Sequence, residues 1–92
     1  MQYHIDLQER RRCERVEQAL AHKRPLDILK AYARGMSPQE VASALYITLT
    51  TVSTHTTRIF SECRVAWDLP EYQSLNYHFL REHFGKYFGY NE

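Results

Sequence analysis

The chain has 92 residues and a formal net charge of +1, with 43% hydrophobic and 25% charged residues and only three glycines and three prolines. This length allows one domain, because domains cluster near ~100–150 residues, and the composition disfavours both disorder and a turn-rich all-β architecture. No apolar run reaches the ~18–20 residues of a membrane span, and the first residues lack the apolar stretch of a signal peptide, so we expect a cytoplasmic, helical protein.

The first predicted helix begins at Asp6 and runs to about residue 22. The carboxylate of Asp6 can cap the free N–H groups, and Glu9 stands three residues further on. Apolar side chains follow at helical spacing at Cys13, Val16 and Leu20. The other face carries the arginines Arg10, Arg11, Arg12 and Arg15. Residues 1–34 hold eight Lys or Arg and five Asp or Glu, which gives a net charge of +3. Residues 66–92 hold two Lys or Arg and four Asp or Glu, which gives a net charge of −2.

The second predicted helix covers residues 26–34. Pro25 is tolerated at its start, since the N–H that proline lacks would be unpaired there, and Gly35 is a typical helix stop. The inward positions of this helix are Leu29, Tyr32 and Ala33.

The third predicted helix covers residues 38–45 and has a well-formed start. Ser37 caps it, Pro38 occupies the first turn, and Glu40 can reach back to the N–H of the cap. A short joint follows, in which Thr48 is the expected cap of the next helix.

The fourth predicted helix covers residues 49–63. One side is lined by Val52, Ile59, Phe60 and Cys63, with Thr56 in the same stripe, and the other side carries Thr50, Ser53, Thr54, Thr57, Arg58 and Ser61. Threonine is a poor helix former, so this segment could by propensity alone equally be a strand, but the period of 3.6 favours a helix. Short hydroxyl side chains are unusual on a merely solvated helix, where Lys, Glu and Gln dominate.

The fifth predicted helix begins at Pro70 and runs to His83 or beyond. Its apolar positions are Tyr72, Leu75, Phe79, Leu80 and Phe84. Residues 67–90 contain eight of the twelve aromatic side chains, more than one helix face can bury in a small core. An uncovered aromatic surface is usually a contact site, so this segment indicates self-association or a partner interface.

Helices three and four, joined by a tight turn, suit a helix-turn-helix, in which the second helix presents short or hydrogen-bonding side chains to base edges in the major groove. The residues carry a more specific signal. The segment ILKAYARGMSPQEVASALYITLTTVSTHTTRIFSECRV resembles the LuxR-type (NarL/GerE-like) DNA-binding domain without a gap. The matching positions are Ile28, Leu29, Ala33, Gly35, Ser37, Glu40, Val41, Ala42, Leu45, Ile47, Thr48, Thr51, Val52, His55, Ile59 and Val65.

This resemblance implies an all-α, four-helix DNA-binding domain with an extra N-terminal helix. Within a single domain over residues 1–92, it places an N-terminal helical extension at 1–22, the DNA-binding core at 26–65, and a C-terminal dimerisation helix and aromatic tail at 66–92. It also implies base contacts from Ser53, Thr54 and Thr57, and phosphate contacts from Thr50, Thr51 and Arg58, with His55 nearby as a packing or phosphate residue. The last helix commonly forms the dimer contact in this family, which implies an interface made by Tyr72, Leu75, Phe79, Leu80 and Phe84.

The sequence departs from the family pattern at charged positions. A common lysine near the end of the recognition helix is Glu62 here, the lysine before the Thr-Val pair is Thr50, and a usual glycine is Arg64. Fewer positive charges weaken phosphate attraction. Arg10, Arg11, Arg12 and Arg15 are candidates for restoring it through phosphate contacts, the alternative being a solvated face paired with neighbouring glutamates. No receiver or ligand-binding domain precedes the motif, so we expect no control by phosphorylation or an autoinducer.

Other chemistries find little support. The two cysteines lack CxxC spacing, and His4, His22, His78 and His83 lack zinc-ligand spacing, so we expect packed thiols and neither a metal nor a cofactor. The sequence has no Gly-rich phosphate loop and no nucleophile elbow, so it is not expected to be an enzyme.

We therefore expect a transcriptional regulator that binds double-stranded DNA as a homodimer and recruits or blocks polymerase. The alternative is a protein-interaction co-regulator or antagonist, in which a degenerate helix-turn-helix docks on a larger DNA-binding partner. Glu62 and the near-neutral fourth helix motivate that alternative.

Overall fold

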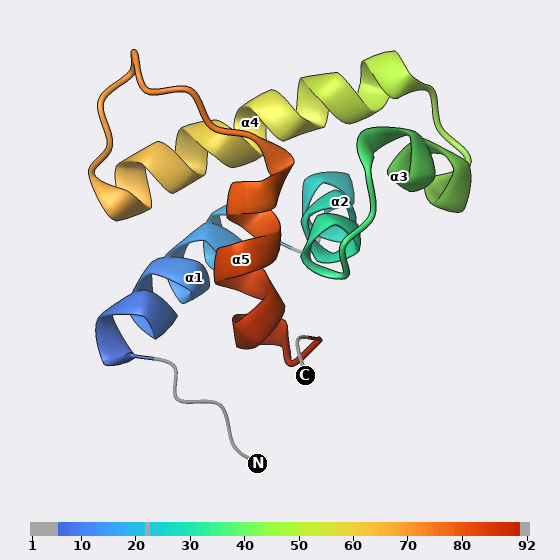
Figure 1. Ribbon diagram of the computed structural model, residues 1–92. Helices are drawn as coiled ribbons and strands as arrows, with labels where there is room; N and C mark the ends of the chain where they lie inside the picture. Colours follow the sequence, from blue (N-terminus) through green and yellow to red (C-terminus); the bar gives the residue numbers. More distant parts are fainter. Residues whose placement is uncertain (1–5, 22, 91–92) are drawn as a thin grey trace.

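The computed structural model describes residues 6–21 and 23–90 (Figure 1). These residues form five α-helices and no strand, which confirms the all-α prediction. The helices are α1 (Leu7–Leu20), α2 (Arg24–Ala33), α3 (Pro38–Leu45), α4 (Leu49–Trp67) and α5 (Tyr77–Phe88). Within this part of the chain, no helix is long and apolar enough to cross a membrane. The expected extension over 1–22 and the tail to 92 include residues 1–5, 22 and 91–92, which lie outside the described residues, as do His4 and His22.

The long helix α4 lies across one side of the molecule, and the other helices pack beneath it (Figure 1). The helix α3 sits at the amino-terminal end of α4, and α1 packs along its carboxyl-terminal half. The helix α5 packs against both α2 and α1. The extra helix α1 therefore contacts three helices of the four-helix unit, namely α2, α4 and α5.

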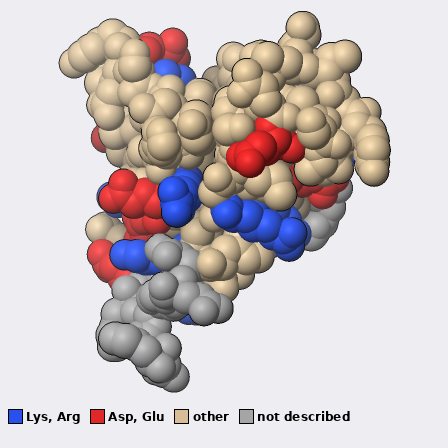
Figure 2. All heavy atoms as spheres, turned by 45° about the vertical axis from the view of Figure 1, so that its right-hand side comes forward, with Lys and Arg blue, Asp and Glu red and all other residues tan. Residues whose placement is uncertain are grey.

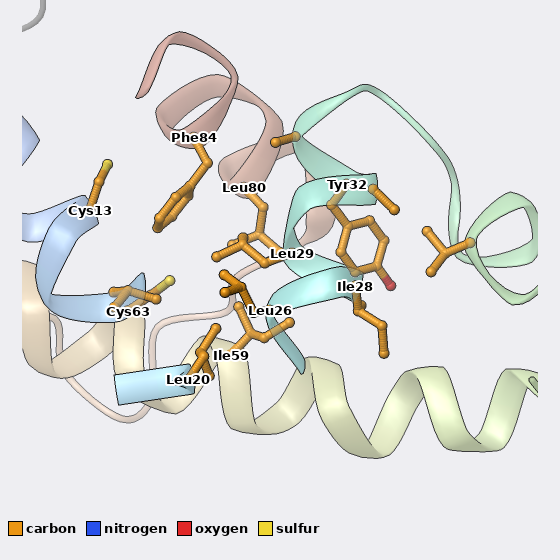
Figure 3. Packing of buried hydrophobic residues seen from close by; sticks show 14 of the residues in the cluster. Cys13, Leu20, Leu26, Ile28, Leu29, Tyr32, Ile59, Cys63, Leu80 and Phe84 are labelled. Carbon is orange, nitrogen blue, oxygen red and sulfur yellow. The ribbon is translucent and has the colours of Figure 1, made fainter. Parts of the chain in front are cut away.

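One buried cluster joins the helices, and its side chains point toward one another (Figure 3). Cys13, Val16 and Leu20 of α1 meet Ile59 and Cys63 of α4, all at most 1% exposed. Burial raises the pKa of both the Cys13 and Cys63 thiols from 9.0 to about 12, so both are neutral. The predicted reduced, packed cysteines are confirmed as free and buried.

The helix starts follow the local signals in the sequence. The Asp6 side chain accepts from the Gln8 N–H, and the Thr48 side chain accepts from the Thr51 N–H. At α3 the capping box is complete, because Ser37 Oγ accepts from the Glu40 N–H at 3.3 Å and Glu40 Oε1 accepts from the Ser37 N–H at 2.8 Å. These caps satisfy N–H groups that a helix start otherwise leaves unpaired.

The predicted end of the fourth helix at residue 63 is one turn too early. Helix α4 continues to Trp67 and ends at Asp68, which adopts a left-handed conformation with φ 55°. The Trp67 ring packs edge-on against the rings of Phe79 and Phe84, with centroid distances of 5.3 Å and 5.8 Å. Its indole N–H donates to Glu9 Oε1 at 3.3 Å. These contacts with α1 and α5 stabilise the extra turn.

The predicted start of the fifth helix at Pro70 is wrong. The segment after Asp68 is a loop in which the Gln73 N–H donates to Pro70 O at 3.1 Å and Arg64 donates to Gln73 O at 2.9 Å. Helix α5 begins only at Tyr77, where Asn76 caps the His78 N–H. Pro70 O therefore accepts from a turn N–H and Gln73 O accepts from an arginine, and neither carbonyl group is part of a helix.

Two residues expected at a dimer contact lie in the core of the chain itself. Leu80 and Phe84 are both 0% exposed, and they point into the buried cluster beside Leu29 of α2 (Figure 3). The apolar face of α5 packs on α2 and α1 of the same chain. Because Leu80 and Phe84 are buried in that contact, they are unavailable to a second molecule in this structure.

Candidate nucleic-acid interface

A tight turn joins α3 to α4. Tyr46 ends α3 in a left-handed conformation with φ 57°, and the Ile47 N–H donates back to Ala42 O at 3.0 Å. Thr48 then caps α4. The chain therefore changes direction within three residues, and α3 packs directly on α4. This is the geometry of a helix-turn-helix.

The inner side of α4 is fixed on α2. Val52 and Ile59 are at most 1% exposed, and Thr56 lies within hydrogen-bond distance of the Tyr32 hydroxyl, with an Oγ1 to Oη distance of 3.0 Å. Thr56 donates its own proton to Val52 O at 2.7 Å, so Tyr32 is the donor in this pair. Burial raises the pKa of Tyr32, which keeps that proton on the phenol.

The outer side of α4 carries the predicted DNA-contacting residues. Ser53, Thr54 and Thr57, the expected base contacts, are all exposed and lie near one another along the helix. Thr50 and Arg58 are also exposed. Thr51 is half-buried, and its hydroxyl bonds to Thr48 at 2.9 Å near the cap. His55 is half-buried on the same helix.

The threonine hydroxyls of this outer side turn back onto the helix. Thr54 Oγ1 donates to Thr50 O, and Thr57 Oγ1 donates to Ser53 O, each at 3.1 Å. Ser and Thr in helices commonly bond in this way to the carbonyl four residues earlier. Each of these two hydroxyl oxygens can therefore still accept a hydrogen bond, while its proton is already used.

A hollow of about 300 Å³ lies beside this face. Ser53 and Thr57 of α4 line one side of it, and Pro38 of α3 and Tyr77 of α5 line others. Tyr77 stacks on Tyr32 with ring centroids 5.8 Å apart. The outer face of α4 is thus bordered by a groove rather than covered by another helix.

The surface around the turn is uncharged. Residues 41–57 contain no Lys, Arg, Asp or Glu. In Figure 2 the upper part of the molecule is mostly uncharged, and charged side chains gather in a band below it. Positive charge near the start of α4 therefore has to come from Arg58 and from neighbouring helices.

The four arginines of α1 do not form one patch. Arg10, Arg11 and Arg15 are exposed, whereas Arg12 is half-buried. Arg12 shares a side of α1 with Arg15 and Ala19, by their spacing of three and seven residues. Ala19 is itself half-buried, and its carbonyl oxygen lies 3.5 Å from an Arg58 nitrogen of α4. This side of α1 therefore faces α4.

The opposite flank of α1 faces α5. Glu17 accepts a hydrogen bond from the Tyr87 hydroxyl at 2.6 Å. Burial, and then the bond to Glu17, raise the pKa of Tyr87, which keeps this proton in place. Arg10 lies seven residues before Glu17, on the same flank. Arg10 is therefore directed away from α4.

Sequence reasoning missed the polar cluster that holds α1 in place. The Glu9 carboxylate bonds to His83 Nδ1 of α5 and to the Trp67 indole of α4. The Cys13 thiol lies 3.6 Å from His83 O. These partners are 58 to 74 residues apart in sequence, and only the acidic residues on an otherwise arginine-rich helix could have pointed to them.

The remaining residues of the expected dimer interface differ in accessibility. Tyr72 is 90% exposed in the loop before α5, whereas Leu75 and Phe79 are half-buried. Tyr46, at the tip of the turn, is 94% exposed and was not singled out from the sequence. The two most exposed aromatic side chains among the described residues, Tyr46 and Tyr72, therefore lie on the loops before and after α4 rather than along α5.

Comparison with known proteins gives a family for the core of the chain. Residues 22–66 match the GerE model of the bacterial regulatory proteins of the luxR family. No curated protein and no solved structure shows significant similarity to the chain. The matched segment spans α2, α3 and nearly all of α4, which are the helices that form and support the turn. Residues 22–66 are therefore a DNA-binding helix-turn-helix domain of the LuxR family of bacterial regulatory proteins.

Proposed function

We propose that this protein is a sequence-specific transcriptional regulator that binds duplex DNA as a homodimer, with α4 in the major groove. The observation that carries the proposal is the outer face of α4. Ser53, Thr54 and Thr57 are exposed on a helix whose other side is fixed by buried contacts with α2. Short hydroxyl side chains on a rigid helix can approach base edges closely.

Phosphate contacts come from both ends of this surface. Thr50 and Thr51 lie at the start of α4, and Arg58 lies two turns further on, beside α1. We assign Arg12 and Arg15 to the same DNA strand as Arg58, because their side of α1 faces α4. Arg10 and Arg11 lie further from the groove.

Among the described residues, the arginines of α1 form no ion pair with the neighbouring glutamates. Within the described residues, which are 6–21 and 23–90, the only ion pair of a carboxylate within 4.0 Å joins Glu9 to His83. Glu17 is occupied by Tyr87. Arginines that have no ion pair within the described part of the chain, next to the proposed DNA-binding helix, support a role in holding phosphates, which supplies the attraction that the uncharged turn cannot.

The homodimer is proposed on the exposed loop aromatics. Tyr72 is 90% exposed, and the neighbouring Leu75 and Phe79 are half-buried. A second copy covering them would place two α4 helices on successive major grooves of a near-palindromic site. Occupancy of that site would then recruit or block polymerase.

The test combines DNA binding with mass measurement. Duplexes from the promoter neighbouring the gene are titrated by electrophoretic shift at several salt concentrations, and light scattering reports the mass of the free protein. We expect salt-sensitive binding by a species of twice the chain mass. Absence of binding above the non-specific level at low salt would refute the proposal.

The role of α1 is tested by removing one positive charge at a time. Arg15→Gln should make the slope of log affinity against log salt shallower by about one per protomer, because one phosphate contact is lost. Arg10→Gln removes the same charge on the flank that faces α5, so it is the matched control and should change the slope by much less. Equal effects of both variants would show that α1 acts through net charge alone.

A protein-interaction module is the second candidate, favoured by the charge-free surface over residues 41–57 and by the exposed rings of Tyr46 and Tyr72. In that case a larger DNA-binding protein co-purifies with the chain. Tyr72→Ala would then release this partner, and the wild-type chain alone would shift no DNA.

A further inference from the structure

The first half of α4 lacks the side chains that usually read purines. Residues 41–57 contain no Arg or Lys and no Asn or Gln. Arg and Lys make the bidentate contact with guanine O6 and N7, and Asn and Gln make the one with adenine N6 and N7. Base recognition by the first half of α4 must therefore depend on other chemistry.

The hydrogen bonds of Thr54 and Thr57 define what these side chains present. Each hydroxyl proton goes to a carbonyl of the same helix, Thr50 O and Ser53 O respectively. The hydroxyl oxygen therefore acts as an acceptor, and the methyl group on the same carbon is left free to meet another molecule. Both residues are exposed, so these methyl groups are accessible.

Methyl groups and acceptors have defined counterparts in the major groove. The C5 methyl of thymine is the one apolar group in the major groove. The hydrogen-bond donors of that groove are the amino groups of adenine and cytosine, whereas guanine presents two acceptors. We infer that α4 recognises its site through thymine methyl groups packed against Thr54 and Thr57, and that these two side chains do not read guanine. This inference rests on the proposed function and names the bases that it selects.

The test begins with selection of bound sites from a random-sequence duplex library by the full chain. The selected duplex is then remade with deoxyuridine in place of thymidine, one position at a time. Loss of a methyl group packed on Thr54 or Thr57 should weaken binding about fourfold per position, the factor that corresponds to ~0.8 kcal/mol per buried carbon group.

Two variants assign the effect to one side chain. Thr54→Ser removes the methyl and keeps the hydroxyl, so it should bind thymidine and deoxyuridine duplexes equally at one position. Thr54→Val keeps a methyl and removes the hydroxyl, so it should still prefer thymidine there. Both substitutions are at an exposed position, and circular dichroism confirms that each variant folds.

The outcomes separate the inference from the proposed function. A selected site whose affinity is insensitive to deoxyuridine overturns the inference while DNA binding stands. If the library yields no selected sequence, the proposed function fails and the inference fails with it. Thymidine preference that survives in Thr54→Ser and in the equivalent Thr57→Ser variant also overturns it.

Discussion

The substitution Tyr32→Phe tests whether the recognition helix is held by a specific hydrogen bond. Tyr32 is 1% exposed, and its hydroxyl donates to Thr56 Oγ1 across the contact between α2 and α4 at 3.0 Å. Thr56 in turn donates to Val52 O. Phenylalanine keeps the ring and its packing and removes only the first donor in this chain.

The expected loss of stability is about 1 kcal/mol. A neutral hydrogen bond contributes ~0.5–1.5 kcal/mol net, because the unfolded chain bonds to water instead. Tyr32 and Thr56 both line the hollow of about 300 Å³, so water can reach the freed oxygen, which keeps the loss out of the upper part of that range. In a chain of this size, ~1 kcal/mol lowers the Tm by about 4–8 °C.

The assay is a double-mutant cycle with Thr56→Val, followed by thermal and urea unfolding. Valine removes the acceptor at nearly constant shape, so the double variant should be less destabilised than the sum of the two single variants, by ~0.5–1 kcal/mol. Tyr77→Phe is the control, since the Tyr77 hydroxyl has no hydrogen-bond partner among residues 6–21 and 23–90. Additive single effects, or an equal loss in Tyr77→Phe, would refute the argument.

Two further predictions concern the core. Phe84→Ala should cost ~3–5 kcal/mol of unfolding free energy, because this ring is 0% exposed. The exposed control Tyr72→Ala should change the unfolding free energy by less than ~0.5 kcal/mol and act only on association. A small effect of Phe84→Ala in thermal unfolding would mean that the ring is not in the core. The pKa values of Cys13 and Cys63 are raised from 9.0 to about 12, so the stability that their neutral thiols provide is complete below pH 9 and is lost as the pH rises toward 12. Urea unfolding between pH 8 and ~11 should therefore show a decline of up to ~1.4 kcal/mol per pH unit for each thiol, and a decline that is unchanged in Cys63→Ala would exclude that thiol as a cause.

Local signals predict the helix-turn-helix well. The bounds of α3 match the prediction from the capping box at Ser37 and Glu40, and Thr48 begins α4 as expected. Each of these features depends on side chains within four residues of the helix end, so the sequence alone contains the determining interaction. The exposed face of Ser53, Thr54 and Thr57 follows in the same way from the helical period.

Features set by distant contacts were not predictable in this way. The last turn of α4 depends on Trp67, which meets α1 and α5, and no local stop signal distinguishes residue 63 from residue 67. Pro70 suits a turn as well as a helix start, and the bond from Arg64 to Gln73 O holds the turn. The apolar spacing of α5 indicated a buried face, but could not tell packing within the chain from packing on a second chain.

The acidic residues of α1 explain how this arginine-rich helix lies beside α4 without an arginine–carboxylate ion pair among the described residues. Glu9 and Glu17 would be the natural partners of the neighbouring arginines, but Glu9 bonds to Trp67 and His83, and Glu17 bonds to Tyr87. These bonds direct the carboxylates toward α4 and α5. The same contacts that dock α1 on the domain therefore leave its arginines without a carboxylate ion pair among the described residues, beside a segment over residues 41–57 that has no charged side chain.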